Sequence, residues 1–98
     1  MLGQRINELR LKFGWSQVEL GKRLSVTKQT VSNWENENIL PSIEMLMRLS
    51  KVFNVPTDYL LGLDDAVYLN VKGLPLDVIA HISQLIEDYR GCFEKYKK

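Results

Sequence analysis

The chain has 98 residues, of which 45% are hydrophobic and 26% charged, and its formal net charge is +1. This length allows one small domain with an extension, and the ordinary composition excludes a disordered chain. The single cysteine, Cys92, excludes an intramolecular disulfide framework, and no run is apolar enough to span a membrane. No basic-then-apolar leader opens the sequence, so we expect a cytoplasmic protein.

The N-terminal part of the sequence predicts helices in quick succession. Apolar residues at helical spacing between positions 2 and 13 indicate a first helix, which Gly14 ends. Ser16, with Glu19 three residues later, predicts a capping box at the start of a second helix. Thr27 is a suitable cap for a third helix. The turn between the second and third helices is short, which suits two helices that cross steeply.

A fourth and a fifth helix follow. Pro41 and Ser42 open the fourth helix. We expect its inward face to carry Ile43, Leu46, Leu49 or Ser50, and Phe53. Pro56 begins a short fifth helix, which Gly62 closes.

After the fifth helix the pattern changes. Residues 64–75 are rich in helix-breaking residues and predict a solvated linker, in which the apolar stretch at 66–71 has no clear assignment. A long amphipathic helix then begins at Leu76. We therefore divide the chain into a helix-turn-helix domain at residues 1–63, a linker at 64–75 and a C-terminal helix at 76–98.

Gly21 lies in the middle of the second predicted helix, where a glycine costs roughly 1 kcal/mol relative to alanine. It falls on the inward side, one turn from Leu24. A steep crossing brings two backbones close together, and a side chain at that point would force them apart. We therefore expect Gly21 to allow close packing of the second and third helices.

Val31 and Trp34 share one face of the third helix and predict its buried side. Glutamine and asparagine can pair with adenine in the major groove, lysine reaches guanine, and threonine can touch a thymine methyl. An ordinary solvated face would be rich in Glu, Lys and Arg, whereas the outward face here carries amides, hydroxyls and one lysine: Thr27, Lys28, Gln29, Ser32, Asn33 and Asn36. This face predicts base reading, and a merely solvated polar face is the alternative for this helix taken alone.

The stretch "SQVELGKRLSVTKQTVSNWEN" is preceded by "GQRINELRLKFGW" and followed by "PSIEMLMRLSKVFNVPTDYLLG". Together they closely resemble the lambda/434 repressor–Cro type helix-turn-helix proteins, also called the XRE family. The resemblance covers about residues 3–62 and all five predicted helices. It implies an all-α fold, a five-helix lambda-repressor-like DNA-binding domain, here followed by a C-terminal dimerisation helix.

The resemblance also implies a function and roles for individual residues. The expected function is a sequence-specific DNA-binding transcriptional regulator, a repressor that reads the major groove with the helix at residues 28–36. Gln17 would hold a phosphate at the start of its helix, and Gln29 and Asn33 would read bases. Beside them, three residues would contact bases or phosphates: Thr27, Lys28 and Ser32.

Within this family, the resemblance implies that Arg10 pairs with Glu35 across the core. This pair would fix the third helix against the first and leave Arg10 near the DNA. The chain departs from the family pattern after the third helix. Glu37 stands where a glycine is usual, and Ile39 and Leu40 stand where basic or polar residues often touch the DNA backbone. These departures put phosphate contacts of this loop in doubt.

The C-terminal helix carries an apolar seam whose members are spaced alternately three and four residues apart: Ile79, Ile82, Ile86, Tyr89, Phe93 and Tyr96. Such a stripe has to be covered. Pairing with a second copy would give a homodimer for a palindromic operator on double-stranded DNA, because relatives bind half-sites roughly 34 Å apart as dimers. A helix folded back on its own domain is the alternative.

Two other classes of function remain to be weighed. An antitoxin-like or adaptor protein would use the C-terminal helix to bind a different protein. An enzyme is disfavoured, because the sequence has no nucleophile–base pairing, no metal cluster and no phosphate-cradling glycine loop. We expect no cofactor and no metal, since His81 has no cysteine or histidine partner at ligand spacing.

Overall fold

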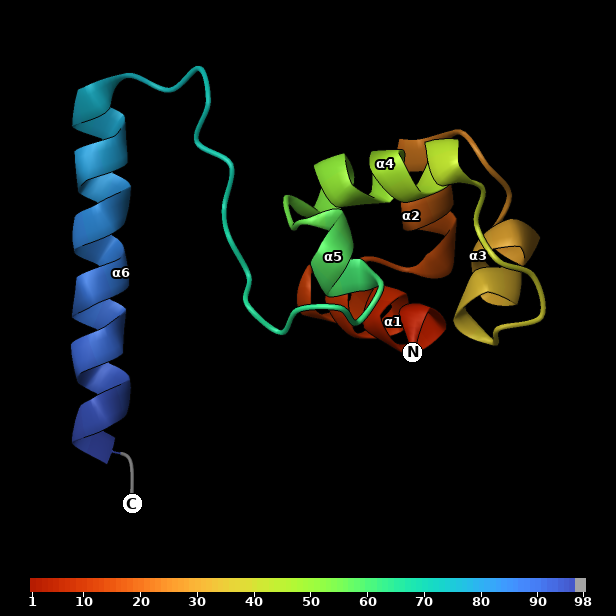
Figure 1. Cartoon of the computed structure of the whole chain (residues 1–98), viewed down its shortest axis with the longest axis horizontal. Coiled ribbons are helices and arrows are strands. Elements are labelled where there is room, and N and C mark those ends of the chain that lie inside the picture. Colours follow the sequence, from red (N-terminus) through yellow and green to blue (C-terminus); the bar gives the residue numbers. More distant parts are fainter. Residues whose placement is uncertain (97–98) are drawn as a thin grey trace.

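A computed structural model describes the backbone of residues 1–96 and the side chains of residues 1–94. Every regular element in this part of the chain is a helix, which confirms the predicted all-α class. Helices α1–α5 pack together, and α6 stands apart at the end of an extended segment (Figure 1). The helices are α1 (Leu2–Lys12), α2 (Gln17–Leu24), α3 (Lys28–Glu35), α4 (Ile43–Phe53), α5 (Thr57–Leu60) and α6 (Leu76–Tyr96).

The predicted helix starts are confirmed by their capping hydrogen bonds. Ser16 Oγ accepts from the Glu19 amide at 3.0 Å, and Thr27 Oγ1 accepts from the Thr30 amide at 3.1 Å. Ser42 caps α4 in the same way. These short side chains accept hydrogen bonds from amides that have no partner within the helix, so the capping residue determines where each helix begins.

The core lies where α1–α5 meet. Nine hydrophobic side chains are buried there: Ile6, Leu20, Leu24, Val31, Trp34, Leu49, Phe53, Val55 and Leu60. The expectation for Ile43 is wrong, because its side chain is 79% exposed. The buried side of α4 runs along Leu49 and Phe53. At 3.6 residues per turn, Ile43 lies roughly 100° around the helix from that side.

The segment between α5 and α6 is extended and is attached to the helical domain. Arg5 on α1 pairs with Asp65 at 2.6 Å, and the Asn54 side chain bonds to the backbone of Asn70. These contacts tether the predicted linker to the domain at two points, while Asp65 and Asn70 themselves stay exposed to solvent. The contact between Arg5 and Asp65 could not be predicted from the sequence, since the two residues lie 60 positions apart.

Helix α6 does not fold back onto the domain, so the folded-back alternative is not the arrangement seen. The closely packed helix pairs all lie among α1–α5. Ile86, Tyr89 and Phe93 of the seam are 41%, 63% and 74% exposed, while Ile79 and Ile82 are half-buried. The Tyr96 side chain lies outside the described residues. None of the described helices combines the length and apolar character of a membrane span.

Candidate nucleic-acid interface

The angle of α3 depends on the tight turn that follows α2. Ser25 adopts a left-handed conformation with φ 59°, and the Val26 amide donates to the Gly21 carbonyl at 2.8 Å. A Cβ built on Gly21 would lie 2.7 Å from the Val26 carbonyl oxygen. The predicted close approach at Gly21 is confirmed, and its partner is the backbone of the turn at Val26 and Thr27.

A second glycine, which sequence reasoning missed, seats the other end of α3. A Cβ on Gly3 would lie 2.4 Å from the Trp34 carbonyl oxygen and 2.8 Å from that of Glu35. Helix α1 therefore lies against the last turn of α3 with almost no space between the two backbones. Gly3 falls at the start of a helix, where no sequence pattern distinguishes a packing glycine from a terminal one.

The same two helices are joined by a polar cluster around Glu35. Arg10 donates through Nε to Oε2 at 2.6 Å and through Nη2 to Oε1 at 3.1 Å, which confirms the predicted pair. Asn7 and Gln17 also donate to Oε1, at 2.9 and 3.1 Å. The helical spacing of Asn7 and Arg10 on α1 is the signal that could have identified Asn7.

The cluster has a clear electrostatic consequence. Burial on its own would raise the pKa of the Glu35 carboxyl, but hydrogen bonds from Arg10, Asn7 and Gln17 and the Arg10 charge outweigh it, so the pKa is lowered. Glu35 is thus held as a carboxylate. It fixes α3 to α1 and to the start of α2.

The opposite side of α3 is open to solvent, as predicted. Lys28, Gln29 and Asn36 are exposed, and Ser32 and Asn33 are half-buried. Two hydrogen bonds order this face, and each joins residues one helical turn apart. Gln29 Nε2 donates to Asn33 Oδ1 at 3.1 Å, and Asn36 Nδ2 donates to Ser32 Oγ at 3.2 Å. The face is a row of prearranged amides and hydroxyls over the buried Val31 and Trp34.

Three other residues expected at the site are placed differently from one another. Thr27 is exposed at the tip of α3, where its hydroxyl caps the helix. Gln17 is the first residue of α2, with its side-chain amide on Glu35. Arg10 is only 9% exposed, and its remaining described donor contact is to the Trp15 carbonyl. These contacts favour a positioning role for Arg10 under the face.

The loop after α3 explains why a glycine is usual at its start. Glu37 has φ 60°, a left-handed conformation that favours glycine, and here a glutamate adopts it. Ile39 and Leu40 are 56% and 71% exposed beside the exposed Ile43. This edge of the site is apolar. Among the described residues, there is no group of three or more side chains suited to holding a metal ion.

Comparison with known proteins places this geometry in a family. A family model described as helix-turn-helix matches residues 6–60. The transcriptional regulator ImmR of Bacillus subtilis is 36% identical over 87 residues, which are 89% of this chain and 68% of ImmR.

Two solved structures share the arrangement of helices. The P22 c2 repressor in complex with a synthetic operator is 38% identical, with a TM-score of 0.62 over 65% of this chain and 97% of that one. SinR in complex with DNA is 37% identical, with a TM-score of 0.58 over 62% of this chain and 98% of that one. The chain belongs to the XRE-type helix-turn-helix family of DNA-binding transcriptional regulators.

Proposed function

We propose that this regulator is a homodimeric repressor that places α3 in the major groove of each half of a palindromic operator. The observation that carries the proposal is the outward face of α3, where Gln29 and Asn36 are exposed and Ser32 and Asn33 are half-buried. Val31 and Trp34 are buried on the other side of the helix. An ordinary solvated face gains nothing from neutral amides, whereas base edges are read by them. Repression would follow from occupying the promoter.

In this proposal, residues of the face divide between bases and phosphates. Gln29 and Asn33 read bases as a coupled pair, because the hydrogen bond between them leaves the Gln29 oxygen and the Asn33 amide group available. Lys28, Ser32 and Asn36 contact bases or phosphates beside them, with Thr27 at the tip. Gln17 offers a phosphate the first amide of α2.

Two similar structures support this assignment. The P22 c2 repressor was solved with a synthetic operator and SinR with DNA, and these two structures cover 65% and 62% of this chain. The helix-turn-helix family model matches residues 6–60, which include α2 and α3. By this analogy, α2 and α3 would lie toward the DNA. The proposal needs no cofactor and no catalytic step. Access to DNA would place the protein in the cytoplasm.

The proposed dimer is formed by α6. Ile86, Tyr89 and Phe93 of its seam are exposed, and the helix lies apart from the helical domain (Figure 1). Val67, Leu69 and Val71 of the preceding segment line an open hollow of about 400 Å³ together with Ile79, Ile82 and Ile86, and Ser83 and Arg90 add polar groups to its wall. A second copy of α6 would cover the seam with side chains of the same kind. Each well-buried apolar side chain contributes about 1.5–3 kcal/mol toward association.

Selection of bound duplexes from a random pool tests the proposal. The native chain should enrich a palindrome with one fixed spacing between its halves. Enrichment of a single, unpaired half-site would support base reading by α3 but would contradict a symmetric dimer. If no sequence is enriched, α3 does not read bases, and the antitoxin-like or adaptor function becomes the better explanation.

A further inference from the structure

We infer that residues 64–71, which we call the strap, act as a fixed spacer that sets which distance between operator half-sites the dimer accepts. This inference rests on the proposed dimer through α6. A strap that is fastened to the domain holds α3 and α6 in one relative position. A free linker would leave that position open.

Arg5 fastens the start of the strap. Its Nη1 donates to the Tyr59 carbonyl at 2.6 Å and to the Asp64 carbonyl at 3.4 Å, and its Nη2 reaches Asp65 Oδ1 at 2.6 Å. Its guanidinium also lies 4.2 Å above the centre of the Tyr59 ring. The Arg5 side chain is only 16% exposed, so α1 and α5 hold it in one place. Arg5 thus binds the strap from a rigid base.

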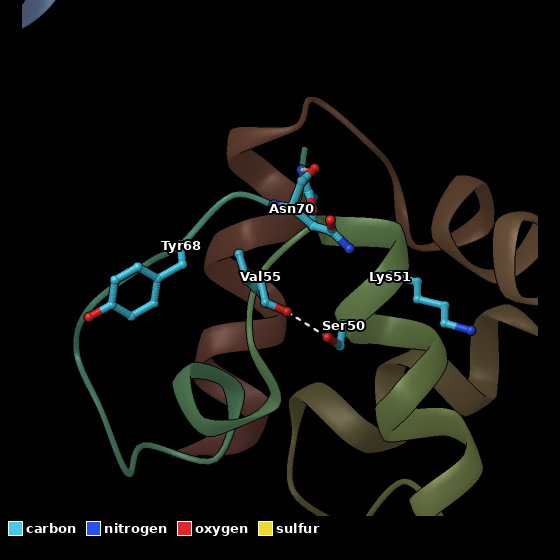
Figure 2. Close-up of a pocket in the computed structure, with 6 residues that line it drawn as sticks. Ser50, Lys51, Val55, Tyr68 and Asn70 are labelled. Atoms are coloured by element: carbon cyan, nitrogen blue, oxygen red, sulfur yellow. Dashed lines mark hydrogen bonds between the residues drawn. The ribbon is translucent and has the colours of Figure 1, made fainter. Parts of the chain in front are cut away.

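Asn54 fastens the other end of the strap. Its Oδ1 accepts from the Asn70 amide at 3.1 Å, and its Nδ2 lies 3.5 Å from the Asn70 carbonyl. The amide side chain therefore pairs with the backbone as a neighbouring strand would. Figure 2 shows Asn70 at the end of α4, beside a hollow of about 370 Å³ that Ser50 and Val55 help to line. Asn54 itself is held by its helix, which it ends with φ 54°.

The chain between the strap and α6 is short. The Leu74 amide donates to the Val71 carbonyl in a turn that contains Gly73 at φ 87°, and α6 begins at Leu76. Apolar residues of the strap and of α6 line the same hollow. The direction of α6 is therefore tied to Asn70, and through Asn54 to α4.

Spacing selectivity follows from this connection. The recognition helices of a dimer must meet major grooves one helical turn apart, about 34–36 Å or 10–10.5 base pairs. A free linker over residues 64–75 would have an end-to-end distance of roughly 20 Å with wide fluctuation, and it would let both halves of the dimer bind at several spacings. With a fastened strap, the second recognition helix cannot reach its half-site when the distance between half-sites is wrong. The gain in affinity from binding both half-sites at once is then lost.

The test compares the native chain with a variant that carries Asn54→Gly and Asp65→Ala. Glycine accepts the left-handed conformation at position 54, and the Asp65 side chain is 93% exposed, so both changes preserve the fold. Affinity is measured for the selected operator, for the same operator with five base pairs inserted at its centre, and for one half-site. The native chain should lose about 10–100-fold on insertion, and the variant less than about threefold.

Lys72→Ala is the control, because it changes an exposed side chain just after the strap and leaves both fastenings in place. It should keep the native loss on insertion. Equal losses for the native chain and the double variant would overturn the inference, as would a native chain that tolerates the insertion. Sedimentation distinguishes failure of the spacer inference from failure of the proposed dimer. If the native chain sediments as a monomer, both the proposed dimer and the spacer inference are wrong.

Discussion

Arg10 and Glu35 meet through two parallel hydrogen bonds, Nε to Oε2 at 2.6 Å and Nη2 to Oε1 at 3.1 Å. Their side chains are 10% and 5% exposed. Arg10 belongs to α1 and Glu35 is the last residue of α3, so the pair fixes the recognition helix on the domain. Its energetics can be tested directly, since the chain also contains exposed pairs for comparison.

Glu35→Gln should lower the free energy of unfolding by about 3–5 kcal/mol, because it leaves the Arg10 guanidinium buried without its counter-charge. Urea unfolding followed by circular dichroism measures the loss. Glu44→Gln is the control. It breaks the exposed pair with Arg48, whose atoms are 3.3 Å apart, and should cost less than about 1 kcal/mol. Equal losses for the two variants would contradict a buried, geometry-fixing role for Glu35.

The pH dependence of stability provides a second test of the same carboxyl. The folded pKa of Glu35 lies below its ordinary value of 4.5, so the unfolded chain takes up this proton first as the pH falls. The stabilisation is complete above that value and is lost as the pH drops toward the folded pKa. Native stability should therefore fall more steeply below about pH 4.5 than that of Glu35→Gln. Parallel curves from urea unfolding at pH 3–7 would show that the shift is absent.

The features predicted from the sequence are those with local signals. Ser16 and Thr27 cap helices whose first turns follow at once, and Gly21 lies five residues from the carbonyl that excludes its side chain. Each is visible within a window of a few residues. The outward phase of Gln29 follows from the neighbouring Val31 and Trp34 for the same reason.

The features that were missed are contacts between distant parts of the chain. Gly3 lies against Trp34, and Arg5 reaches Asp65 across 60 positions. Asn54 pairs with the backbone of Asn70, and backbone pairing leaves no mark on the partner's residue type. The prediction that Ile43 points inward was wrong for a different reason. An apolar residue in the first turn of a helix is compatible with more than one choice of the buried side.

Gln29→Ala should weaken binding to the selected operator by about 1–3 kcal/mol and relax the preference at one base position. The change removes a base contact and also frees Asn33 from its hydrogen bond to Gln29. Competition binding against single-base operator variants measures both effects. Gln4→Ala is the control, since Gln4 is exposed on α1 and bonds to Glu8. An unchanged base preference in Gln29→Ala would remove this residue from the reading face.

Two glycines should respond to alanine in opposite directions. At Gly21 a Cβ would lie 2.7 Å from a backbone carbonyl oxygen, so Gly21→Ala should destabilise the domain by about 1–3 kcal/mol. At Gly91 nothing lies within 4 Å, so Gly91→Ala should only gain helix propensity, up to about 1 kcal/mol. Thermal and urea unfolding compare the two. A Gly21→Ala chain as stable as the native one would show that the turn can move away without cost.

Ile82→Asp combined with Ile86→Asp should convert the proposed dimer to a monomer in sedimentation equilibrium. Both residues belong to the seam, and carboxylates buried there would face their own copies. Because α6 lies apart from α1–α5, the helical domain should keep its fold and its affinity for one half-site. Affinity for the full operator should fall by about 10²–10⁴-fold as the second contact is lost.

The matched control for the seam is His81→Asp combined with Gln84→Asp, which places the same charges outside the seam. At 3.6 residues per turn, His81 lies about 110° and Gln84 about 170° around the helix from the middle of the seam. The control should remain dimeric, because its charges stay in solvent. A seam variant that still sediments as a dimer would move the interface elsewhere on the chain. A control that dissociates equally would show that added charge, and not the position of the seam, disrupts association.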